Sequence, residues 1–117
     1  MAKHFDFEEG SIQFKRYRNG QIAMQHYNNK GIPNATLTVA VDNCPLSDKE
    51  VLIKDWSEND GVLHDLIKHE IVSKPVREVV SGYASIHVCR LLVDGTSGNV
   101  LKIQTHSKKQ QADEQVY

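Results

Sequence analysis

Hydrophobic residues occupy every second position in the segment IPNATLTVAVD. Ala35, Leu37, Val39 and Val41 alternate there with Thr, Ala and Asp. A period of two with β-branched residues is typical of a strand that buries one face. The pattern therefore predicts a half-buried strand over residues 35 to 42.

A hairpin is predicted before that strand. IQFKRYR (12 to 18) and QIAMQHY (21 to 27) are extended runs joined by Asn19-Gly20, a dipeptide that accepts positive φ. Short connections then arrange the three strands as an antiparallel meander. One face is expected to be buried and to carry Ile12, Phe14, Ile22, Met24 and Leu37. The opposite face carries Lys15, Tyr17, Gln25 and Thr38.

Helical spacing follows in residues 58 to 70, where the apolar positions form one stripe. The stripe consists of Val62, Leu63, Leu66, Ile67 and Ile71. Ser57 with Asp60 three residues later is a variant of the capping box, and acids suit the positive end of a helix. We expect a helix of about three turns that begins at Ser57 and packs on the meander.

The remaining apolar runs predict further strands. VLIKD (51 to 55) is a short one, ASIHVCRLLV (84 to 93) a long one, and VLKIQT follows the turn DGTSGN. In the long strand apolar residues point to both sides, so both faces are expected to be covered. The predicted fold class is α+β: an antiparallel β-meander sheet packed against one main α-helix, with additional C-terminal strands.

Composition supports one ordinary domain. The chain has 117 residues and a formal charge of −1, which gives no global attraction to nucleic acid or anionic membrane. No apolar run approaches the roughly 20 residues that span a bilayer, and MAKHFDFEEG lacks the apolar core of a signal peptide. We expect a cytoplasmic protein with a single domain over 1 to 105 and a polar tail over 106 to 117.

Catalytic patterns do not appear in the sequence. Cys44 and Cys89 lack CxxC spacing and are expected to be free thiols, and no GxSxG, Walker or Rossmann motif is present. Asp60 and His64 stand four apart on the predicted helix, but a metal site needs three or four converging ligands. The expectation is a protein that is not an enzyme and has no cofactor or metal.

The stretch DWSENDG is the first candidate for a binding surface. Asp55, Trp56, Glu58 and Asp60 gather an indole and three acids in six positions. The helix dipole stabilises an acidic residue at a helix start by only about 0.3 to 1 kcal/mol, which is a weak reason for three acids there. Trp56 either packs the helix against the sheet or is an exposed anchor for a protein partner. Partly exposed Trp residues surrounded by charged groups often have the second role.

A basic hairpin is the alternative candidate. Lys15, Arg16, Tyr17 and Arg18 combine three cations with an aromatic ring, a composition that suits phosphate contact and base stacking. Alternation sends these side chains to both faces, and Lys and Arg on edge strands also protect against aggregation. The basic residues are therefore interpreted first as a solvated strand edge. A small nucleic-acid-binding module that uses them is the alternative function.

Three segments carry a resemblance to a known family: YRNGQIAMQHYNNKGIPNATLTVAV, CPLSDKEVLIKDWSENDGVLHDLI and VVSGYASIHVCRLL. They resemble a family of small uncharacterised bacterial proteins encoded on conjugative elements and phages. Trp56 stands where the family pattern has Tyr, and Asp60 where it has Glu. The family is a domain of unknown function, so the resemblance implies a genomic setting and no catalytic residue.

That setting implies a class of function by association. Accessory proteins of mobile elements include inhibitors of host defence, among them anti-CRISPR and anti-restriction proteins. The expectation is a non-catalytic protein that binds a host or element-encoded protein.

Overall fold

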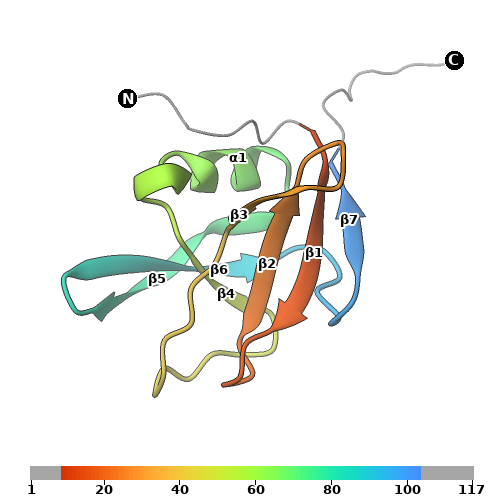
Figure 1. Cartoon of the computed structure of the whole chain (residues 1–117). Helices are drawn as coiled ribbons and strands as arrows, with labels where there is room; N and C mark the ends of the chain where they lie inside the picture. Colours follow the sequence, from red (N-terminus) through yellow and green to blue (C-terminus); the bar gives the residue numbers. More distant parts are fainter. Residues whose placement is uncertain (1–8, 104–117) are drawn as a thin grey trace, which may run out of the picture.

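The computed structural model describes residues 9 to 103, apart from the side chain of Glu58. Two antiparallel sheets and one short helix make up the fold, which is therefore α+β (Figure 1). The first sheet has the order β3-β2-β1-β7, with β1 Ser11–Arg16, β2 Ile22–Tyr27, β3 Pro33–Thr36 and β7 Val100–Lys102. The second has the order β4-β6-β5, with β4 Glu50–Ile53, β5 Val72–Ser81 and β6 Ala84–Leu91.

The predicted hairpin is confirmed. β1 and β2 pair from Ser11–Tyr27 to Arg16–Ile22, and Gly20 in the turn has φ +91°. The alternation of the sequence holds on both strands. Ile12, Phe14, Ile22 and Met24 are all buried, so this face of the first sheet forms part of the core as predicted.

The third strand is shorter than predicted and changes sheet. β3 ends at Thr36 rather than continuing to residue 42. The backbone then turns to the second sheet, where Val39 N donates to Leu52 O at 3.1 Å and Lys54 N to Leu37 O at 2.9 Å. Thr38, predicted on the solvent face, is buried at this corner and its Oγ1 accepts from Met24 N at 3.1 Å. The single meander sheet of the prediction is therefore two sheets joined by this crossing segment.

The predicted main helix is also shorter. α1 spans only Val62–Lys68 and follows a 3₁₀ turn at Ser57–Asn59. Its N-cap is Gly61, with φ +92°, and Ser57 makes no side-chain cap, so the predicted capping box is wrong. At the other end Glu70 takes φ +60°, and Ile71 N donates to Leu66 O at 2.9 Å, the pattern of a Schellman motif. These two positive-φ residues limit the helix to seven residues.

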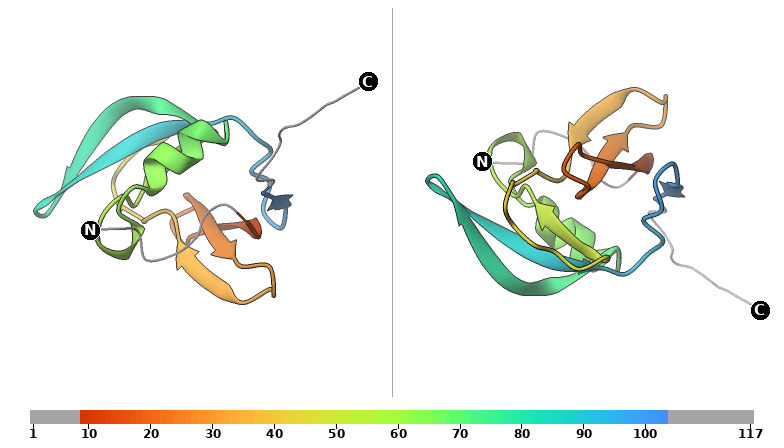
Figure 2. Two further views of the ribbon diagram at one scale, coloured as in Figure 1. Left: turned by 90° about the horizontal axis from the view of Figure 1, so that it is seen from above. Right: turned by 90° about the horizontal axis from the view of Figure 1, so that it is seen from below.

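The helix lies across the gap between the two sheets (Figure 2). Val62, Leu63 and Leu66 are buried and belong to the same cluster as the inner faces of β1 and β2. The predicted packing of the helix on the meander is therefore matched only loosely: the helix shares the main cluster with the meander strands, but the strand it packs beside is β5 of the second sheet.

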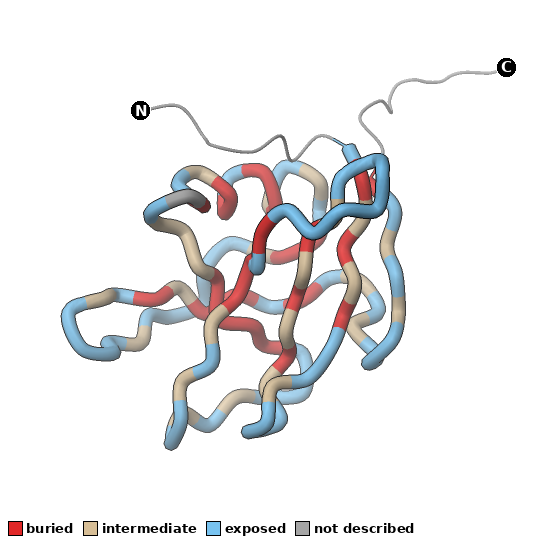
Figure 3. The backbone as a smooth tube through the Cα atoms, viewed as in Figure 1, coloured by how far each residue is buried: buried red, intermediate tan, exposed pale blue. Residues whose placement is uncertain are grey.

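Buried hydrophobic residues form two clusters. Figure 3 marks all buried positions in red. The main cluster fills the space between the two sheets and α1. The second lies on the other face of β6, where Leu52, Ile86 and Val88 are buried beneath the segment 39 to 46. Both faces of β6 are thus covered, as its sequence pattern predicts.

β5 and β6 form a hairpin that extends away from the body of the molecule (Figures 1 and 2). β4 pairs with β6 only as far as Ile53–His87. The part of the hairpin beyond that point, residues 79 to 86, has no β4 residue beside it and is called the arm below.

The predicted boundary between the domain and a tail at 105 lies outside the described residues. Within residues 9 to 103, no helix is long and apolar enough to span a membrane.

Candidate functional site

Asp55 organises the loop that precedes α1. Its Oδ1 accepts hydrogen bonds from Gly61 N at 3.1 Å and from Leu63 N at 3.0 Å. Both are amide groups at the start of a helix, which have no partner within the helix itself. Asp55 therefore performs the capping role that the sequence assigned to Ser57, and its carboxylate is engaged within the fold.

Trp56 is half-buried against the second cluster. It follows β4 by three residues, and it packs against the cluster whose buried members are Leu52, Ile86 and Val88. Trp56 is also the only tryptophan of the chain. Part of the indole therefore packs against the sheet, as one interpretation of the sequence expects, and part is exposed at the surface.

An apolar groove of about 470 Å³ opens between Trp56 and the tip of the arm. Its lining consists of Trp56, Ser81, Tyr83, Ala84 and Ser85, and we call it the arm-tip groove. Tyr83 is fully exposed, and Val80 beside it is 74% exposed. Exposing an aromatic ring and an aliphatic side chain to water at the end of a projecting hairpin is unfavourable in free energy, and these side chains add no packing to the fold.

The other acidic candidates lie on the 3₁₀ turn and the loop that follows. Asp60 is exposed and its backbone N donates to Ser57 O at 3.1 Å. Glu58 belongs to the same turn. Both residues follow Trp56 within four positions of the sequence. Asp55, by contrast, turns inward to cap the helix.

Two of the four residues of the basic hairpin, Arg16 and Tyr17, form hydrogen bonds within the chain. Arg16 Nη1 donates to Gly95 O at 3.0 Å. The Tyr17 hydroxyl lies 3.0 Å from both the carbonyl oxygen and Oγ1 of Thr38. Lys15 and Arg18 are exposed. The ring that would stack on a base is thus tied to Thr38 in the segment that crosses between the sheets.

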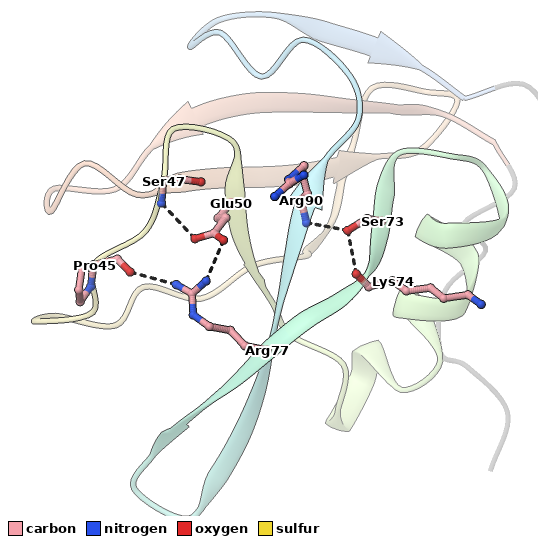
Figure 4. A network of polar contacts seen from close by, with 7 residues as sticks. All are labelled: Pro45, Ser47, Glu50, Ser73, Lys74, Arg77 and Arg90. Carbon is pink, nitrogen blue, oxygen red and sulfur yellow. Dashed lines mark hydrogen bonds and ion pairs between the residues drawn. The ribbon is translucent and has the colours of Figure 1, made fainter.

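A polar network fastens β5 to β4 on the outer face of the second sheet (Figure 4). Arg77 Nη1 lies 2.8 Å from Glu50 Oε2, and Arg77 Nη2 donates to Pro45 O at 3.1 Å. Glu50 also accepts from Ser47 N at 3.0 Å. The hydrogen bond from Arg77 lowers the pKa of Glu50, and the Ser47 amide lowers it further. The charges of Arg77 and Glu50 are therefore neutralised by each other.

The cysteines are free, as predicted. Cys89 is completely buried in the main cluster. Burial raises the pKa of its thiol to about 11, and the nearby charge of Asp55 adds to the rise. The Cys89 thiol is therefore protonated at neutral pH and is not a nucleophile.

A polar cleft of about 530 Å³ lies between the β1–β2 turn and the segment 44 to 50. Its amide and charged groups serve the fold: Gln21 Nε2 donates to Val41 O at 2.8 Å and to Cys44 O at 3.1 Å. Over the described part of the chain, no group of three or more His, Cys, Asp or Glu side chains converges to hold a metal ion.

Comparison of the chain with protein-family models, with curated proteins and with solved structures gave no match.

Sequence reasoning missed Tyr83 and Val80. The available signal was Ser81-Gly82-Tyr83-Ala84, in which Gly82 with φ +62° opens a two-residue turn and leaves Tyr83 at its outermost position. A bulky ring at that position of a tight turn points to solvent unless another element covers it.

Proposed function

We propose that the protein acts by binding another protein through the arm-tip groove and carries out no reaction itself. The observation that supports this most directly is the placement of Tyr83. Its ring is fully exposed at the end of a projecting hairpin and shares an apolar groove with Trp56. Tyr and Trp are the residues most enriched among those that dominate binding energy at interfaces.

The groove offers an apolar floor with polar residues at its border. Ala84 and the exposed part of Trp56 supply apolar surface, while Ser81 and Ser85 supply hydroxyl groups. Apolar centres with polar rims are typical of surfaces that bind protein partners. Asp60 and Glu58 follow Trp56 in the sequence and add negative charge to this region, which favours a partner with a basic rim.

The resemblance to proteins of mobile elements supplies the class of partner to test first. A host defence protein of the anti-CRISPR or anti-restriction target type is the narrower form of the proposal. It rests on that resemblance, whereas the binding surface rests on the arm-tip groove.

Affinity capture with the tagged full-length chain tests the binding surface. Nuclease-treated bacterial lysate is passed over the wild type and over Tyr83→Ala. Because Tyr83 makes no packing contact that would be lost, the variant should remain folded while its yield of the captured protein falls about 10-fold or more. Arg18→Ala is the matched control, because Arg18 is exposed on the far hairpin.

A second variant tests the acidic residues, with Glu58 and Asp60 both changed to Lys. Loss of capture in this folded variant supports a binding surface that includes them. Unchanged affinity in both this variant and Tyr83→Ala contradicts the proposal. Capture that disappears on nuclease treatment and weakens steeply with salt indicates nucleic acid as the ligand instead.

A further inference from the structure

The outer edge of β5 has no neighbouring strand among residues 9 to 103. Its two halves differ. The first half contains Lys74, Pro75 and two register shifts, between Val72 and Pro75 and between Pro75 and Arg77. Lysine, proline and bulges at a sheet edge hinder pairing with another chain. The second half, 77 to 81, pairs with β6 without irregularity and has none of these features.

The register fixes which backbone groups of the second half point outward. Ser81 and Ala84 flank a two-residue turn, so they form a hydrogen-bonded pair. In an antiparallel ladder such pairs alternate with pairs whose N–H and C=O groups point away from each other. Counting back from Ser81, the outward positions of β5 are Val80 and Glu78. Two donors and two acceptors therefore face the free edge.

The charged side chains of this half have partners within the chain. Arg77 is paired with Glu50 at 2.8 Å. Glu78 accepts from Ser85 Oγ at 3.0 Å, and its other oxygen lies 3.2 Å from His87 Nδ1. Val80 adds an exposed aliphatic side chain. An edge that is regular and partly apolar, and that carries no lysine, proline or bulge, lacks the features that hinder pairing with a copy of itself.

We propose that this edge pairs with the same edge of a second copy of the chain, antiparallel and about a two-fold axis at Val79. The axis stands perpendicular to the sheet, so the outward groups of Glu78 meet those of Val80 in the second copy and form four hydrogen bonds. An axis at Glu78 would instead set two carboxylates side by side, which is unfavourable. The two three-stranded sheets then form one continuous sheet.

The projection of the hairpin makes this contact accessible. The bodies of the two copies lie at opposite ends of the paired strands, because the strands run antiparallel and each hairpin extends away from its own body (Figure 2). The arm-tip groove is lined by Trp56, Ser81 and residues 83 to 85 at the end of the hairpin, whereas self-pairing uses backbone groups of Glu78 and Val80, so the two contacts involve different groups.

Sedimentation equilibrium of the full chain, from about 10 μM to about 1 mM, tests the pairing. The wild type should show a monomer–dimer equilibrium. Val80→Pro removes an outward N–H that the β5–β6 ladder does not use, and should weaken association about 10-fold or more with an unchanged circular dichroism spectrum. Val80→Ala keeps the N–H and should weaken association less than the proline variant. A wild type that is monomeric over the whole range overturns the proposal.

Cysteine substitution tests the register. In a Cys44→Ser background, Val79→Cys should give a disulfide-linked dimer on mild oxidation, because the axis places the two Cβ atoms opposite each other. Val80→Cys faces Glu78 of the second copy and should give far less. Equal linkage in both variants, or linkage from Val80→Cys alone, overturns the stated pairing. A monomeric wild type whose protein capture is lost in Val80→Pro shows that a partner's strand occupies the edge, which overturns self-pairing. Capture retained in Tyr83→Ala would then place partner binding at this edge instead of the arm-tip groove, whereas capture lost in both variants leaves the groove in the binding surface.

Discussion

The two hydrophobic clusters differ in how fully they are enclosed. The main cluster has two sheets and α1 around it, and its largest side chains, including Phe14 and Leu37, are completely buried. The second has a buried centre of only three residues, and a ring of partly buried ones around them, with Trp56 and Val79 on the side of the arm. Stability should therefore depend mainly on the main cluster, while the open rim of the second is free to bind.

The largest expected effect comes from breaking the main cluster. Phe14→Ala removes a completely buried ring and leaves a cavity between the sheets, which should lower the free energy of unfolding by about 3 to 5 kcal/mol. Urea denaturation followed by circular dichroism measures it. A loss near 1 kcal/mol would show that the main cluster is not the centre of stability.

A smaller loss is expected from the second cluster. Leu52→Ala removes a side chain that is just as buried, but the segment 39 to 46 above it can relax into the space. The free energy of unfolding should fall by about 2 to 3 kcal/mol, because the cost of a cavity depends on how far its walls collapse. Tryptophan fluorescence reports this region, since Trp56 packs against the cluster that contains Leu52 and is the only tryptophan. A loss equal to that of Phe14→Ala would remove the distinction between the clusters.

Features set by local sequence could be predicted, whereas features set by tertiary pairing could not. Period-two alternation and Asn19-Gly20 located the β1–β2 hairpin and its buried face, because local turn chemistry and one-sided burial determine both. The end of β3 at Thr36 was not predictable from the alternation, which continues through Leu37 and Val39. Only the tertiary pairing with β4 moves these residues from one sheet to the other.

The site shows the same limit. Trp56 could be selected from its surroundings in the sequence, but its position beside Tyr83 depends on β6 extending past the end of β4. The capping error has a local cause. Ser57 and Asp60 fit the spacing of a capping box, yet the helix begins only at Val62, where Asp55 accepts from the amides of Gly61 and Leu63, so spacing alone could not locate the cap.

The network that fastens β5 to β4 should contribute less than either cluster and should depend on pH. Hydrogen bonds lower the pKa of Glu50 in the folded state, so its stabilising effect is present above the unfolded pKa and is lost as pH falls through the lowered folded value. Glu50→Gln should lower the free energy of unfolding by about 0.5 to 1 kcal/mol at pH 7, since Arg77 is partly exposed. The difference from wild type should shrink as pH falls through the lowered folded pKa and disappear once the carboxyl is protonated in both states. Denaturation at several pH values measures it, and Glu70→Gln at an exposed site is the control for loss of a charge. A difference that is unchanged at low pH would show that the ion pair is not its cause.

The smallest expected effect is a gain in the free energy of unfolding from a substitution at the end of α1, next to the main cluster. Glu70 ends α1 in the left-handed region, with φ +60°, and its backbone N donates to Ile67 O at 3.0 Å. A residue with a Cβ atom is strained there by about 1 to 2 kcal/mol, whereas glycine is not. Glycine also gives the unfolded chain more freedom, which offsets about 0.5 to 1 kcal/mol of that relief. Glu70→Gly should therefore raise the free energy of unfolding by roughly 0.5 kcal/mol, while Glu70→Ala, which keeps the strain, should give no gain. Thermal denaturation of the two variants in parallel measures the difference. If the alanine variant is as stable as the glycine variant, the helix does not end in the left-handed conformation, and the closure of the main cluster at Ile71 needs another explanation.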